Sequence, residues 1–160
     1  MKKIMIQVAD ERWTMEALHL ACAMARDGES VISLVRFMEV GHPSYLGTNM
    51  GYIAPTQQEY RELQEYQATA EDYGVELDVC SIQCLSALDV IAQAAHELEA
   101  DVVFVRVPES SIPSWRKMQR WTLERSLKGQ HCQLYTLDQP ANVTEWVPSV
   151  TVKAGVSTKS

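Results

Sequence analysis

The apolar residues of this chain change spacing repeatedly, from the period of a strand to the period of a helix. Five short, strongly apolar runs are typical of strands buried on both faces of a sheet, and they start near Ile4, Val31, Val75, Asp101 and His131. Between them, apolar residues repeat at helical spacing over ten or more positions. Strands joined through helices require crossover connections, which produce a parallel sheet. The sequence therefore predicts an α/β fold: a single doubly wound domain with a five-stranded parallel sheet and helices on both faces.

This alternation covers residues 1–138, which we interpret as one domain. With 160 residues, of which 46% are hydrophobic, the chain can bury roughly 70% of its unfolded surface around a single core. Residues 139–160 are polar and irregular apart from an apolar stretch at 147–152, so this tail could be a strand, an arm or a disordered segment. Residues 38–55 are rich in glycine and proline and predict a long loop, for which a lid, disorder and self-association remain open.

The charge balance excludes several classes of partner. The chain has 21 acidic and 14 basic residues, and its formal net charge is −7. Binding to nucleic acid or to an anionic membrane requires clustered Lys and Arg, so we expect neither partner. No apolar run approaches the roughly 20 residues of a membrane span, and four cysteines do not make a disulfide scaffold in a chain of this size. We expect a cytoplasmic protein.

Three segments resemble the universal stress protein family in their order and spacing. Residues 4–11 (IMIQVADE) stand where that family has a strand running into a Val-Asp-Gly-Ser-like turn, and residues 35–39 are a loose counterpart of its Leu-His-Val-like segment. Residues 100–106 (ADVVFVR) match its Ala-Asp-Leu-Ile-Val-Met-Gly strand without a gap. The resemblance covers about residues 2–137. It implies the strand order 3-2-1-4-5, a crevice between the first and fourth strands, and a non-catalytic, homodimeric stress protein.

The sequence departs from this family at the nucleotide site. Nucleotide-binding members carry Gly, two residues, Gly, nine residues, Gly and then Ser or Thr, so that bare backbone can close around phosphate. In this chain the glycine positions fall on Arg106, Glu109 and Gln119, and the hydroxyl position falls on Arg120. The early aspartate aligns with Ala9, one residue before Asp10. We therefore expect that the chain does not bind ATP in the usual way of the family.

The same crevice gives the candidate ligand site. Ligands of doubly wound sheets bind outside the carboxyl ends of the strands, where the strand order switches. The residues expected to border that point are Asp10, Arg106, Ser110, Ser111 and Ser114, the last at the start of a helix. They could form a sensor site for a small anion or a nucleotide. Alternatively, Arg106 could pair with Asp10 or Glu109 and fill the crevice, and we favour this second interpretation.

No residue pattern predicts catalysis, a cofactor or a metal. The four histidines lie on different predicted elements, and no pair has metal-ligand spacing. Cys80, Cys84 and Cys132 are interpreted as core thiols. The chain has no P-loop, no Cys-x-x-Cys and no Gly-x-Ser-x-Gly elbow, so we expect that it is not an enzyme.

Two features bear on protein partners. The last predicted strand, residues 132–137, would be an open sheet edge, and we expect a homodimer through it, with residues 147–152 as a further contribution. Five basic residues lie between Arg116 and Lys128, and we interpret them as a solvated helix face rather than a docking surface. Trp115 and Trp121 are six positions apart, so one of them is expected to face away from the core.

Overall fold

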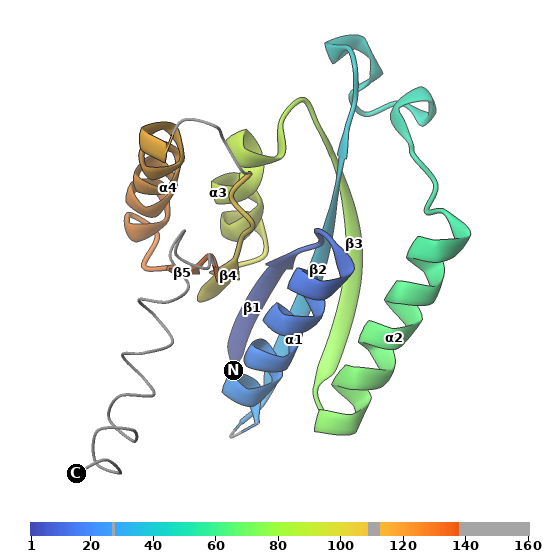
Figure 1. Cartoon of the computed structure of the whole chain (residues 1–160), viewed down its shortest axis with the longest axis vertical. Helices are drawn as coiled ribbons and strands as arrows, with labels where there is room; N and C mark the ends of the chain where they lie inside the picture. The colour runs from blue at the N-terminus through green and yellow to red at the C-terminus, as the bar shows by residue number, and fades with distance from the viewer. Residues whose placement is uncertain (27, 109–112, 138–160) are drawn as a thin grey trace, which may run out of the picture.

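The computed structural model describes residues 1–26, 28–108 and 113–137. In this part of the chain, five parallel strands form one sheet in the order β3-β2-β1-β4-β5 (Figure 1). The strands are β1 (Lys2–Gln7), β2 (Ser30–Glu39), β3 (Glu76–Cys84), β4 (Val102–Phe104) and β5 (Gln133–Tyr135). The predicted fold class and strand order are confirmed. The predicted tail, residues 139–160, lies outside the described residues.

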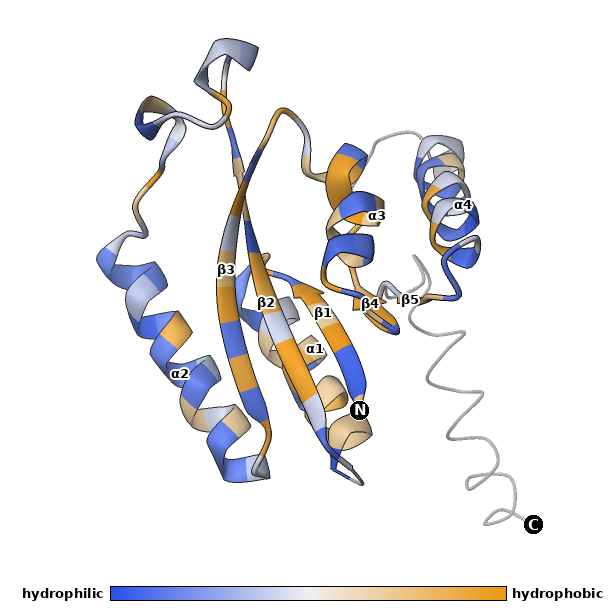
Figure 2. Cartoon of the chain, turned by 180° about the vertical axis from the view of Figure 1, so that it is seen from behind, coloured by the Kyte–Doolittle hydropathy of each residue, from blue (hydrophilic) through white to orange (hydrophobic). Residues whose placement is uncertain are grey.

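In the described ranges, four α-helices cover the two faces of the sheet. Helices α1 (Glu11–Ala25) and α2 (Gln57–Tyr73) pack on one face, and α3 (Ala87–Glu97) and α4 (Pro113–Lys128) pack on the other (Figure 1). Side chains alternate between faces along each strand. Ile32 and Leu34 of β2 therefore belong to the core under α1 and α2, and Val35 belongs to the core under α3 and α4. Figure 2 shows the apolar strands at the centre and the largely hydrophilic α2 outside them.

Local sequence signals explain where the helices begin and end. Asp10 caps α1, because its side chain accepts a hydrogen bond from the backbone N–H of Trp13 at 3.1 Å. Helix α2 starts with a reciprocal capping box between Thr56 and Glu59, and it ends at Gly74, whose φ of 71° suits glycine. Helix α4 begins at Pro113, so Ser114 lies inside its first turn.

The long connection after β2 is held against the end of β3. It contains two short 3-10 helices, η1 (Pro43–Tyr45) and η2 (Asn49–Gly51). The Gln83 side chain accepts from the backbone N–H of Gly47 at 2.6 Å and donates to the backbone carbonyl of Thr48 at 2.9 Å. These hydrogen bonds hold the middle of the loop beside β3. In the sheet, β2 lies between β3 and the β1–β4 pair.

Among the described residues, no helix combines the length and the apolar character that a membrane span requires.

Candidate site at the β1–β4 edge

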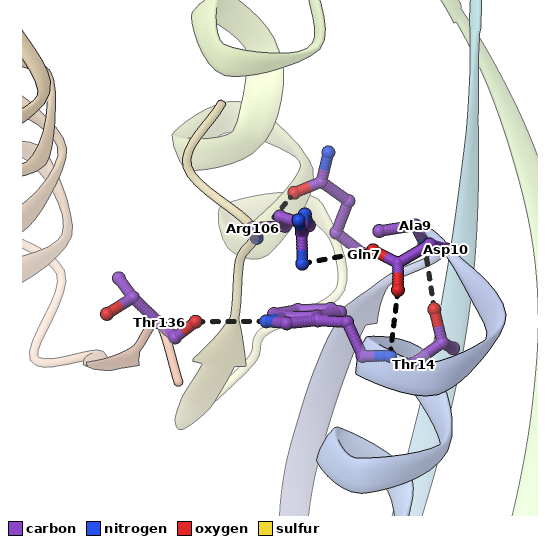
Figure 3. Close-up of polar contacts among 7 residues, drawn as sticks. Gln7, Ala9, Asp10, Thr14, Arg106 and Thr136 are labelled. Carbon is purple, nitrogen blue, oxygen red and sulfur yellow. Dashed lines mark hydrogen bonds and ion pairs between the residues drawn. The ribbon is translucent and has the colours of Figure 1, made fainter. Parts of the chain in front are cut away.

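An ion pair joins the segments that follow β1 and β4. Ile6 and Phe104 are neighbours in the parallel register, so the residues after each strand emerge side by side. Arg106 Nη1 lies 3.0 Å from Asp10 Oδ1 (Figure 3). The backbone N–H of Arg106 also donates to Gln7 Oε1 at 3.0 Å. The structure therefore brings together the two charged residues that the sequence placed at this crevice.

Asp10 is fixed by a second interaction. Its Oδ2 atom accepts from the backbone N–H of Trp13, while Oδ1 faces Arg106. The preceding backbone N–H, that of Ala9, donates to the buried Thr14 hydroxyl at 2.9 Å. The side chains of Arg106 and Asp10 are 38% and 53% exposed, so their pair contributes at most about 1 kcal/mol to folding. The pair therefore fixes the relative position of the two side chains and adds little to the stability of the fold.

Trp13, whose backbone N–H donates to Asp10, is close to this ion pair in the sequence and is buried. Its side chain is 5% exposed, and its indole N–H donates to the backbone carbonyl of Thr136 at 3.1 Å (Figure 3). This bond connects the start of α1 to the chain just after β5. Neither Gln7 nor Trp13 was predicted as part of the site. Gln7 could have been found as a polar residue at the end of an apolar strand. No sequence pattern indicates Trp13.

The predicted serines do not add to this arrangement in the described part of the chain. Ser114 is exposed on α4 and forms no hydrogen bond there with Asp10 or Arg106. Ser110 and Ser111, together with Glu109, lie outside the described residues. Their predicted place at the crevice stays a prediction.

Solved structures share this arrangement of strands and helices. A universal stress protein in complex with cAMP superimposes with a TM-score of 0.56 at 12% identity, over 87% of this chain and 98% of that one. This is the universal stress protein fold. Universal stress proteins from Archaeoglobus fulgidus (TM-score 0.52, 14% identity, 86% and 94% coverage) and Burkholderia pseudomallei (0.51, 17%, 85% and 95%) agree. No family model matches the sequence, and no curated protein does either.

The universal stress protein fold buries most of the thiols of this chain. All four cysteines are free, and burial raises the pKa of Cys22 and of Cys132 to about 11. Burial also raises the pKa values of Cys80 and Cys84. These thiols are protonated and weakly nucleophilic at neutral pH. Within the described residues, no group of three or more His, Cys, Asp or Glu side chains could hold a metal ion.

Both tryptophans of helix α4 in this chain are exposed to solvent. Trp115 and Trp121 are exposed, so the prediction that one of them faces away from the core holds for both. The guanidinium of Arg125 lies 5.3 Å from the centre of the Trp121 ring, and Arg120 pairs with Glu124 at 3.1 Å. Part of the basic character of α4 is therefore satisfied within the helix itself.

Proposed function

We propose that this chain is a non-catalytic universal stress-type protein that does not bind ATP in the usual way of that family. The ion pair between Arg106 and Asp10 carries the proposal. By the sequence resemblance, Arg106 stands where a nucleotide-binding relative has a glycine, and its side chain forms an ion pair with Asp10. A triphosphate would have to break this pair and then lie against the carboxylate of Asp10, which the cap of α1 holds in place.

A second candidate function is an anion sensor at the same crevice. The half-exposed guanidinium of Arg106 favours it, because a charged group near solvent can exchange one partner for another at low cost. A small anion would then displace the carboxylate of Asp10 from Nη1. The two functions differ in whether the native chain binds an anion or nucleotide through Arg106.

Calorimetry with ATP, AMP and cAMP separates the two functions, cAMP being the ligand of one structural relative. We expect no micromolar binding to the native chain, because Asp10 already neutralises Arg106. Asp10→Asn should uncover weak, salt-sensitive anion binding, and Asp10→Asn combined with Arg106→Gln should remove it again. Micromolar binding of a nucleotide by the native chain that Arg106→Gln abolishes would favour the sensor and overturn the main proposal.

We also propose that the protein works in the cytoplasm as a homodimer joined through β5. The four free thiols support a reducing compartment. In the described part of the chain β5 is an edge strand, with β4 as its neighbour. The backbone N–H of Gln133 donates to the carbonyl of Asp101, and the backbone N–H of Val105 donates to the carbonyl of Tyr135, both at 2.9 Å. The backbone groups of residues 133 and 135 therefore face β4. The N–H and carbonyl of Leu134 therefore point to the open edge, because these directions alternate along a strand.

Leu134→Pro tests this dimer with little change to the β4–β5 pairing. Among backbone groups it removes only the N–H that faces the open edge, and it also replaces a leucine side chain that packs against the core under α3 and α4. We expect the dimer to dissociate at least about tenfold more readily, as one or two lost hydrogen bonds would cause. Leu134→Ala, which shortens the side chain and keeps the N–H, should remain dimeric in sedimentation velocity runs. A monomeric native chain at micromolar concentration, or equal behaviour of the two variants, would contradict association through this edge.

A further inference from the structure

A groove separates α3 from α4, which lie side by side on one face of the sheet (Figures 1 and 2). Its volume is about 390 Å³. Leu123 of α4 is buried in its lining, and Leu88 and Ala92 of α3 are partly buried there. Trp115 and Met118 of α4 also line it, and each is about half exposed. The groove is therefore largely apolar, and it opens to solvent along α4.

The apolar surface of the groove continues onto the outer face of α4. Trp115, Met118 and Thr122 follow one another at steps of three and four positions, which places them on one side of the helix. Trp121 comes three positions after Met118, and its side chain is 58% exposed. Single exposed apolar residues are ordinary, but a contiguous patch with a polar border is typical of a protein contact surface.

Basic side chains border this patch. Helix α4 has five basic residues and one acidic residue, whereas the whole chain has a net charge of −7. Lys117, Arg125 and Lys128 have no carboxylate partner within ion-pair distance among the described residues. They lie four positions before, four positions after and seven positions after Trp121, so all three share its side of the helix. An acidic partner would complement this face.

The shape of the surface favours a protein helix over other acidic partners. A groove between two helices fits the apolar side of an amphipathic helix, whereas a bilayer or a duplex is too broad to enter it. The net charge of −7 also repels nucleic acid and anionic membranes. A second copy in a two-fold contact would bring its own basic α4 against this one. Asp89 lines the α3 side, so the acidic groups of the partner must lie along α4.

We propose that the α3–α4 groove binds an acidic amphipathic helix of a partner protein. Apolar side chains of that helix would enter the groove between Trp115 and Ala92. Its Asp and Glu side chains would face Lys117, Arg125 and Lys128. The lining residues of α4 extend over positions 115–126, or about 16 Å, which matches about three turns of a bound helix. This surface uses neither Arg106 nor β5, so it does not depend on the function proposed above.

Selection of random 16-residue peptides, displayed on phage, against the full chain tests the proposal. We expect the enriched peptides to be acidic, with apolar residues at helical spacing. Met118→Glu should weaken binding of a selected peptide about tenfold in fluorescence anisotropy, because it places a negative charge at the groove. Lys117→Glu should weaken it about fivefold and reduce its dependence on salt. Lys2→Glu, the matched control, makes the same change of charge on β1 and should leave binding unchanged.

Four outcomes would overturn the proposal. They are no enriched peptide, enrichment of basic peptides, equal effects of Lys117→Glu and Lys2→Glu, and a native dimer that Met118→Glu converts to a monomer. Binding to vesicles of phosphatidylcholine and phosphatidylglycerol, or to double-stranded DNA, in place of peptides would also overturn it. Ala92→Trp is a second variant, which fills the groove from α3 and keeps the surface of α4. It should abolish peptide binding, and retained binding in this variant, folded by circular dichroism, would reject the groove.

Discussion

Trp13→Ala is expected to lower the free energy of unfolding by about 3–5 kcal/mol, the largest effect of any single change considered for this chain. The substitution removes a large aromatic side chain that is 5% exposed, and it leaves a cavity at the start of α1. It also leaves the carbonyl of Thr136, in a buried residue, without its indole donor. Urea denaturation followed by far-ultraviolet circular dichroism measures the change as a lower midpoint at an unchanged slope.

Two further tryptophan variants show where this effect comes from. Trp13→Phe keeps most of the buried apolar area and loses only the hydrogen bond to Thr136, so it should cost about 1–2 kcal/mol. Trp121→Ala removes an exposed ring on α4 and should cost less than about 0.5 kcal/mol. If Trp13→Ala and Trp121→Ala were equally mild, Trp13 would not connect α1 to the end of β5 in solution.

Arg36 and Glu59 are expected to respond to substitution in opposite directions. Arg36→Met should raise the free energy of unfolding by about 1 kcal/mol, because an apolar side chain of similar length needs no partner in the core. Glu59→Gln should lower it by about 1–2 kcal/mol, since it leaves Arg36 charged and buried without its ion-pair partner. The lower figure allows for the exposure of Glu59, whose side chain is 44% accessible.

A double-mutant cycle isolates this interaction. Glutamine at position 59 can still form the capping box with Thr56, so the start of α2 stays intact. In the Arg36→Met background, Glu59→Gln should therefore have almost no effect on urea denaturation. A loss of stability in Arg36→Met itself would show instead that the guanidinium is satisfied within the fold.

The fold could be predicted from the sequence because the apolar residues of each strand and each helix repeat at the spacing typical of that element. The apolar runs at Ile4, Val31 and Asp101 are buried on both faces, which is the environment of inner parallel strands. The ends were harder to predict. The last strand was expected over residues 132–137 and extends only over Gln133–Tyr135, because pairing with a three-residue β4 limits its length. Apolar residues predict well that a strand exists, but they predict poorly the residue at which its hydrogen bonding stops.

The residues of the candidate site and of the pair between Arg36 and Glu59 could likewise be predicted only in part. Asp10 and Arg106 could be predicted together, because parallel neighbouring strands deliver their following residues to the same edge. Arg36 carried a signal as a charge inside an apolar strand, and alternation alone places it on a covered face. Its partner could not be predicted. Glu59 comes from a helix more than twenty positions later, and its approach depends on how the intervening loop is anchored on Gln83.

The two halves of the sheet differ greatly in the length of their hydrogen-bonded ladders. Strands β2 and β3 pair along Val31–Glu39, whereas β4 and β5 pair only along Val102–Phe104. Partial unfolding from the native state should therefore begin in the short half, since local opening starts where the fewest contacts hold an element in place. Such an opening would separate Arg106 from Asp10 while the ion pair between Arg36 and Glu59 stayed in place, so the two pairs would not break in the same opening event.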